Sequence, residues 1–159
     1  MNKMTTDYTA LPDVEINERV APYLGIDPGK TGALALPAHH LVVDMPPSAH
    51  DLCDLLIEWD KYFPIVILER QQAFPHQGVT SSFTTGERYG MLQGVLAARG
   101  LPYRIVGASM WKRQLGLPAD KELVRARARE LFPWAELHLK KYEGRAHALM
   151  LAEWGRRFA

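Results

Sequence analysis

The chain has 159 residues, 47% of them hydrophobic, which suits one domain that buries its core without disulfides or a structural metal. A single cysteine, Cys53 in an apolar stretch, excludes an intrachain disulfide, and no signal peptide or apolar run of the roughly 18 residues of a membrane span is apparent, so we expect a cytoplasmic protein. The net charge of +1 is the sum of an acidic and a basic part of the chain. Residues 1–98 carry six Lys/Arg and twelve Asp/Glu, whereas residues 99–159 carry thirteen Lys/Arg and six Asp/Glu. The basic part is compatible with a polyanionic partner.

Three short strands are predicted in the first third of the chain. Residues 1–20 are polar and lack a period, so we interpret them as a flexible extension that precedes one domain over residues 21–159. Tyr23–Asp27 is an apolar run that ends at Pro28-Gly29, which predicts a buried strand followed by a turn. Gly32–Leu36 and Leu41–Asp44 follow as further strands, and the three are expected to form an antiparallel meander.

Helices and strands alternate through the rest of the chain. Ser48–Trp59 is predicted to be a helix capped by Ser48, and the apolar, β-branched Pro64–Glu69 a fully buried strand. The remaining predictions are a loop at Arg70–Ser81, a strand at Tyr103–Val106, and helices at Thr84–Arg99, Lys121–Phe132 and Arg145–Arg157. This order predicts an α/β domain with a mixed five-stranded sheet and helices on both faces, the order of ribonuclease H-like folds. The order of elements does not set the function.

A phosphate-binding loop is the first functional candidate, because Gly25–Thr31 (GIDPGKT) nearly matches the Walker A pattern. The match fails in two ways. Only three residues separate the first glycine from Gly29-Lys30 where four are needed, and a strand pattern follows instead of a helix N-terminus. We therefore expect no nucleotide cofactor.

Two acidic residues, Asp27 and Glu69, each end a predicted buried strand. If these strands are neighbours in the sheet, both carboxylates point into one cleft, where they repel each other unless a cation lies between them. Hard oxygen ligands suit Mg²⁺ or Mn²⁺, and two such ions can activate water and stabilise the leaving oxygen in phosphodiester hydrolysis. The alternative is that a strand-end aspartate only forms the turn.

A second pair of possible ligands, Glu143 and His147, is four residues apart at the start of the last predicted helix. Residues with this spacing share a helix face, so both are expected at the open edge of the cleft. The alternative for this pair is an ordinary solvated helix surface.

Several short motifs together resemble the Holliday-junction resolvases of the RuvC type, particularly those carried by phages. They are GIDPG (Gly25–Gly29), ILER (Ile67–Arg70), Trp111-Lys112, Asp120-Lys121 and GRAHALMLAEWG (Gly144–Gly155). The resemblance extends over Tyr23 to Arg157 and implies a metal-dependent endonuclease that cuts branched DNA as a homodimer.

The resemblance also implies roles for individual residues. It makes Asp27 and Glu69 the first two metal ligands and Glu143 a conservative replacement for an aspartate. His147 stands where phage members usually carry an acidic residue. This departure implies either a shift of metal preference towards Mn²⁺, because imidazole is a softer ligand, or an impaired enzyme that binds without cutting well.

Basic residues near the end of the chain are candidates for DNA contacts. The resemblance matches Lys112 and Lys121 to residues that contact the scissile region, and it gives Lys121 a catalytic role. Lys121, Arg125 and Arg129 recur every four residues and predict a cationic stripe that contacts phosphates. The alternative is a solvated helix face.

The loop after Glu69 carries two more candidates, Arg70 and Phe74. By the resemblance this loop reaches the junction centre, where Phe74 would stack on unpaired bases, a contact worth roughly 1–3 kcal/mol. Phe74 packed under its own loop is the alternative.

Glycines at 86, 90 and 94 recur on one helix and suggest a close backbone approach, either to the sheet of the same chain or to a second subunit of a C2 dimer.

Competing functions follow from the same residues. A junction-binding protein with weakened catalysis is the nearest alternative, motivated by His147. A nucleotide-hydrolysing protein would need two such domains, for which 159 residues are too few. An RNase H acting on hybrids shares the fold, and only a panel of substrates separates it from a resolvase.

Overall fold

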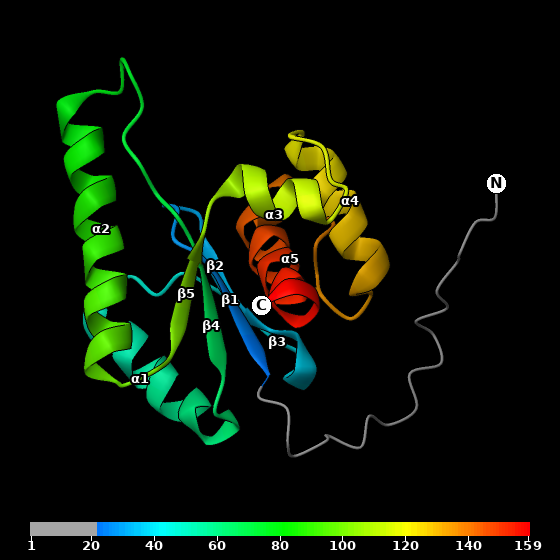
Figure 1. Ribbon diagram of the computed structural model, residues 1–159, viewed down its shortest axis with the longest axis horizontal. Helices are drawn as coiled ribbons and strands as arrows, with labels where there is room; N and C mark the ends of the chain where they lie inside the picture. Colours follow the sequence, from blue (N-terminus) through cyan, green and yellow to red (C-terminus); the bar gives the residue numbers. More distant parts are fainter. Residues whose placement is uncertain (1–21) are drawn as a thin grey trace.

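Residues 22–159 are described by a computed structural model, in which one sheet lies between two layers of helices (Figure 1). The predicted extension at residues 1–20 lies outside the described residues. The strands are β1 (Tyr23–Asp27), β2 (Ala33–Leu36), β3 (Leu41–Asp44), β4 (Ile65–Glu69) and β5 (Tyr103–Val106), in the spatial order β3-β2-β1-β4-β5. The first three pair antiparallel, whereas β4 pairs parallel with both β1 and β5. The predicted mixed five-stranded sheet is confirmed.

Helices cover both faces of the sheet, as predicted. On one face lie α1 (Ala49–Trp59) and α2 (Val79–Ala98), and on the other lie α3 (Ala108–Gln114), α4 (Lys121–Leu131) and α5 (Glu143–Phe158) (Figure 1). Three short 3-10 turns, η2 (Pro37–His39), η3 (Asp60–Tyr62) and η4 (Lys140–Tyr142), complete the order. Ser48 caps α1 by accepting the N–H of Asp51, which follows from the preference for serine at this position.

The alternation of side chains along the strands divides the core into two parts. Leu24 and Ile26 of β1, with Val66 and Leu68 of β4, pack against α1 and α2. Ile67 of β4 faces the other side, where it belongs to the core beneath α3, α4 and α5. Because successive strand residues point to opposite faces, every second residue of β1 and β4 points towards α5.

Helix α5 lies unusually close to β1, and two glycines make this possible. A Cβ on Gly25 would lie 1.9 Å from the main-chain oxygen of Ala148, and one on Gly144 would lie 2.0 Å from that of Thr31. The small residues at these contacts let the helix backbone touch the strand backbone. The start of α5 is thereby held over the end of β1.

The structure differs from the sequence predictions in two helices. Helix α3 was not predicted, because it has only seven residues, no side-chain cap, and a single buried residue, Trp111. Helix α2 begins at Val79 instead of Thr84, and its N-terminal part extends beyond the sheet (Figure 1). Strand β2 follows the Gly25–Thr31 segment, so this segment lacks the helix that a phosphate loop requires.

Two further features of the sequence are placed by the structure. Cys53 on α1 is half-buried. A Cβ at Gly86, Gly90 or Gly94 would meet nothing within 4 Å in the described chain, so these glycines do not mark an approach to its own sheet. Within residues 22–159, no helix has the length and apolarity required to cross a bilayer.

Candidate functional site

Asp27 and Glu69 end adjacent strands at the same edge of the sheet. Strands β1 and β4 pair parallel, with Ile26 opposite Leu68, and the same offset puts Asp27 beside Glu69. The alternation of the strands turns both side chains towards the face covered by α3 and α5. The N–H of Gly29 donates to Oδ1 of Asp27 at 3.0 Å, so the Pro28-Gly29 turn orients this carboxylate.

Helix α5 brings His147 to the same place. Nδ1 of His147 lies 3.4 Å from Oδ2 of Asp27, and the histidine is only 8% exposed. Its other ring nitrogen, Nε2, is buried without a hydrogen-bond partner in the described part of the chain. A buried nitrogen without a partner is costly unless a ligand satisfies it, so Nε2 is a candidate donor to a metal ion.

Burial and neighbouring charges both change the pKa of Glu69. Burial raises the pKa of Glu69, and the neighbouring Asp27 carboxylate raises this pKa further. The indole Nε1–H of Trp111 donates to Oε2 of Glu69 at 2.9 Å, and this hydrogen bond lowers the pKa, as do His147 and Lys112. A carboxyl group whose charge is disfavoured by burial and by a neighbouring carboxylate is a common arrangement around a bound cation.

We expect Glu69→Gln to stabilise the metal-free protein at neutral pH. Because the folded pKa of Glu69 is raised, the protonated form is favoured by folding, and the ionised form destabilises the fold as pH rises through that pKa. Glutamine removes the charge and keeps an acceptor for Trp111. The expected gain in Tm near pH 7 is roughly 2–4 °C, the effect of ~1 kcal/mol in a domain of this size.

Thermal unfolding followed by circular dichroism between pH 4 and pH 8 measures this effect. The gain should vanish as pH falls below the pKa of an ordinary glutamate, where both folded and unfolded chains are protonated. Glu58→Gln, which changes an exposed carboxylate on α1, is the matched control and should leave Tm unchanged at every pH. A Glu69→Gln protein less stable than the native chain at pH 7 would contradict the expectation.

Glu143, the remaining predicted ligand, starts α5 and has a different partner. Its Oε2 lies 3.4 Å from Nζ of Lys121, at the start of α4. Among residues 22–159, no group of three or more His, Cys, Asp and Glu is arranged to hold a metal ion. The donor types still fit a hard divalent cation, because Asp27 lies beside His147, Glu69 ends the neighbouring strand, and Nε2 of His147 is buried without a partner in the described part of the chain.

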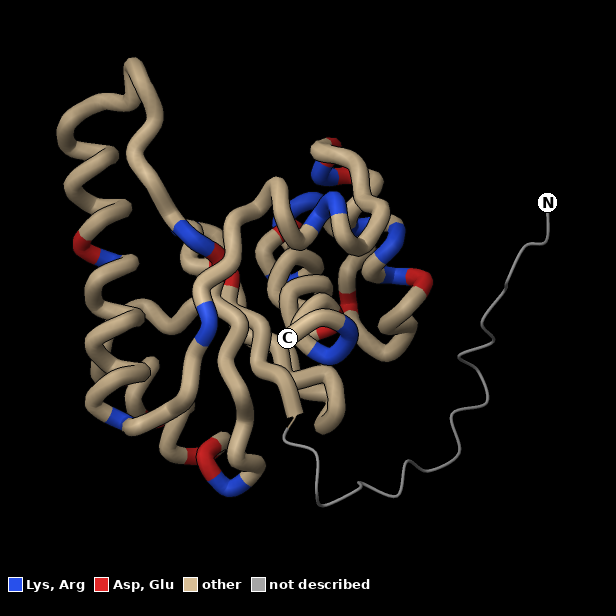
Figure 2. Tube along the Cα trace, in the orientation of Figure 1, with Lys and Arg blue, Asp and Glu red and all other residues tan. Residues whose placement is uncertain are grey.

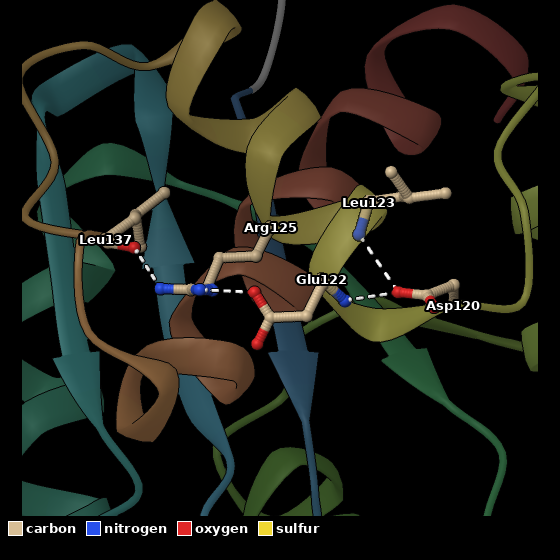
Figure 3. A network of polar contacts seen from close by, with 5 residues as sticks. All are labelled: Asp120, Glu122, Leu123, Arg125 and Leu137. Atoms are coloured by element: carbon tan, nitrogen blue, oxygen red, sulfur yellow. Dashed lines mark hydrogen bonds and ion pairs between the residues drawn. The ribbon is translucent and has the colours of Figure 1, made fainter.

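The predicted cationic stripe on α4 is interrupted at Arg125. Its guanidinium donates to the carbonyl of Leu137 at 3.0 Å and to the carboxylate of Glu122, and only 12% of its side chain is exposed (Figure 3). Asp120 caps the same helix by accepting the N–H groups of Glu122 and Leu123 (Figure 3). The contacts of Arg125 tie α4 to the segment before α5, so its guanidinium is not available to a phosphate in this arrangement.

The other basic candidates remain accessible. Lys121 is 64% exposed, Arg70 and Arg129 are exposed, and Lys112 is half-buried with its Nζ 5.3 Å from the ring centre of Trp111. Basic residues gather on α3, α4 and the end of α5, whereas α2 carries few charges (Figure 2). The positive part of the chain therefore adjoins the acidic site along one layer of the fold.

Phe74 lies in the loop between β4 and α2, and 63% of it is exposed. Its N–H donates to the side-chain oxygen of Gln77 at 3.1 Å, which shapes the loop. The alternative in which Phe74 packs under its own loop is therefore not the arrangement that the structure shows.

Two contacts at the site were absent from the sequence predictions. One is the hydrogen bond from Trp111 to Glu69. The other is the bidentate ion pair of Arg145 with Asp44, which connects the start of α5 to the end of β3. Nε of Arg145 donates to Oδ1 of Asp44 at 2.6 Å, and Nη2 donates to Oδ2 at 3.0 Å. The sequence analysis named Trp111 only as part of the pair Trp111-Lys112. Because a buried indole N–H requires a hydrogen-bond acceptor, a buried tryptophan could have indicated a polar partner. A pairing of residues 101 positions apart has no local signal.

Comparisons with known proteins agree with this architecture. No protein-family model and no curated protein matches the chain. Among solved structures, the Thermus thermophilus RuvC in complex with a Holliday junction substrate matches with a TM-score of 0.57 and 21% identity, over 86% of this chain and 95% of that one. A structure of Thermus thermophilus RuvC matches with the same TM-score and 18% identity, over 85% of this chain and 95% of that one. The chain therefore has the RuvC-like variant of the ribonuclease H-like fold.

Proposed function

We propose that this protein is a metal-dependent endonuclease that cuts four-way junctions or other branched DNA by paired hydrolysis of phosphodiester bonds. The observation that carries the proposal is the pair Asp27 and Glu69, in register on adjacent parallel strands, with His147 beside them. The fold likeness supports the choice of substrate, because one matching structure is a RuvC with a Holliday junction. The resemblance to phage-borne members remains a prediction.

Individual residues would have separate roles in binding the metal and the phosphate. Asp27, Glu69 and Nε2 of His147 would hold Mg²⁺ or Mn²⁺, and Glu143 would join them when it leaves Lys121. The chemistry that a divalent ion would supply at these residues is polarisation of the scissile phosphate and activation of an attacking water. Lys121, largely exposed at the start of α4, would neutralise phosphate charge next to the site.

Cleavage of a synthetic four-way junction tests this proposal, with a linear duplex of the same sequence as the control. Each substrate is incubated with Mg²⁺, Mn²⁺ or EDTA, and the nicks are mapped on both strands. We expect paired nicks in the junction with metal and none in the duplex. A preference for Mn²⁺ would support His147 as a ligand, because imidazole is a softer donor than carboxylate. Junctions left intact with both metals would contradict the nuclease proposal.

A second candidate function is a junction-binding protein with a weakened site. Two observations favour it: Glu143 is paired with Lys121, and the described residues contain no preformed group of three ligands. Binding of the junction without nicks in either metal is the result that this candidate predicts.

A homodimer with α2 at its interface would supply two symmetric cuts. Val79 and Phe83 of α2 are 87% and 71% exposed, and the glycines at 86, 90 and 94 face open space in the described chain. We expect the native protein to sediment as a dimer and Gly90→Gln to sediment as a monomer with an unchanged fold, because a side chain there meets nothing in its own subunit. A native monomer at micromolar concentration would contradict this proposal.

We expect Lys121→Ala to weaken junction binding and to reduce the slope of log K against log salt concentration by about 1, the effect of one lost phosphate contact. Fluorescence anisotropy at several salt concentrations measures both quantities. Lys61→Ala, on η3, is the control for the loss of one lysine elsewhere on the molecule and should leave the slope unchanged. An unchanged slope in Lys121→Ala would remove this lysine from the DNA contacts.

A further inference from the structure

Trp111 donates a hydrogen bond to Glu69, and the pairing of β5 with β4 explains how the two residues meet. Strand β5 pairs with β4 so that Val106 is opposite Glu69, and the N–H of Arg70 donates to the carbonyl of Val106 at 2.8 Å. The chain then turns at Gly107 into α3, the helix that carries Trp111. The register of an edge strand thus determines which helical residue meets the end of β4.

The contacts of Trp111 are directed at the site. The residue is fully buried, and its indole donates to Oε2 of Glu69 at 2.9 Å. Its ring and that of His147 lie edge to face, with 5.7 Å between their centres and 71° between their planes. Trp111 therefore contacts two of the three residues at the candidate site, although it has no donor atom for a cation.

We propose that Trp111 is a positioning residue of the metal centre: it holds one oxygen of Glu69, leaves the other for the metal, and fixes the ring of His147. This inference rests on the proposed function. Groups that orient metal ligands typically change metal affinity by 10–100-fold when they are removed.

The chain contains a matched control for this residue. Trp154 on α5 is also buried, at 1% exposure, and belongs to the same core as Trp111. Its Nε1–H donates at 2.7 Å to Oε1 of Gln114, an amide and not a carboxylate of the site. Trp111→Phe and Trp154→Phe each remove one indole hydrogen bond and retain a buried aromatic ring, so their structural costs are comparable.

Binding of Mn²⁺ to the full chain, followed by electron paramagnetic resonance of the free ion, is the first test. We expect Trp111→Phe to raise the Kd for Mn²⁺ at least tenfold and Trp154→Phe to change it less than twofold. Equal changes in the two variants, or no change in either, would overturn the inference. A native chain that neither binds Mn²⁺ nor cuts junctions would overturn the proposed function instead.

The second test needs neither metal nor a tryptophan variant that folds. Indole N–H resonances of ¹⁵N-labelled protein are compared between the native chain and Glu69→Ala, which removes the acceptor of Trp111. We expect the Trp111 resonance to move and its N–H to exchange faster with solvent, while the Trp154 resonance stays in place. A Trp111 resonance unchanged by Glu69→Ala would overturn the inference, whatever the nuclease assay shows.

Discussion

Asp27→Asn is expected to abolish junction cleavage while junction binding persists. Asparagine has nearly the same shape and still accepts the N–H of Gly29, so the turn after β1 is retained. It removes one of the two negative charges that would hold the cation between β1 and β4. Loss of several kcal/mol of metal-derived stabilisation corresponds to a rate at least about 10³-fold lower.

Single-turnover cleavage and a gel-shift titration with the same junction measure the two effects separately. Glu58→Gln is the control for removal of a carboxylate, because Glu58 is exposed on α1, on the opposite face of the sheet. It should cut at the native rate. Full activity in Asp27→Asn would remove Asp27 from the metal centre, and loss of binding together with cutting would point to a damaged fold.

Gly25→Ala is expected to have the largest effect on stability. The new Cβ would lie 1.9 Å from the main-chain oxygen of Ala148 and 2.7 Å from the main-chain nitrogen of Ala152. Neither neighbour is a flexible side chain, so α5 must move away from β1. We expect a loss of about 3 kcal/mol or more, a large part of the 5–15 kcal/mol that stabilises a typical domain.

Cleavage should fall in the same variant, because α5 carries both Glu143 and His147. Urea denaturation gives the change in the free energy of unfolding, and the junction assay under native conditions gives the activity. Gly78→Ala, at the start of α2 where a Cβ meets nothing within 4 Å, is the control and should cost no more than about 1 kcal/mol. Unchanged stability in Gly25→Ala would contradict the close packing of α5 on β1.

Local patterns in the sequence were sufficient for the order of the elements. The runs Tyr23–Asp27 and Ile65–Glu69 are strands because each is short and mostly apolar, and the first is followed by the turn residues Pro28-Gly29. The positions of Asp27 and Glu69 at strand ends follow from the same local signals. Their roles as ligands remain predictions, but their places in the chain could be read directly.

Helix α3 shows where local patterns are insufficient. It has seven residues, and Trp111 is its one buried side chain, so no apolar period is visible in the sequence. Arg125 shows the same limit for charge. In the sequence it continues the four-residue spacing of Lys121 and Arg129, but the carbonyl of Leu137, twelve residues away, accepts its hydrogen bond.

By itself, therefore, the sequence determined which segments form the five strands and the four longer helices, and which strands end in a carboxylate. Only the tertiary structure decided which groups meet: His147 with Asp27, Trp111 with Glu69, and Glu143 with Lys121. The physical reason is the range of the interactions. Turn and periodicity signals act over a few residues, whereas these contacts depend on the register of strands and on how closely α5 packs against β1.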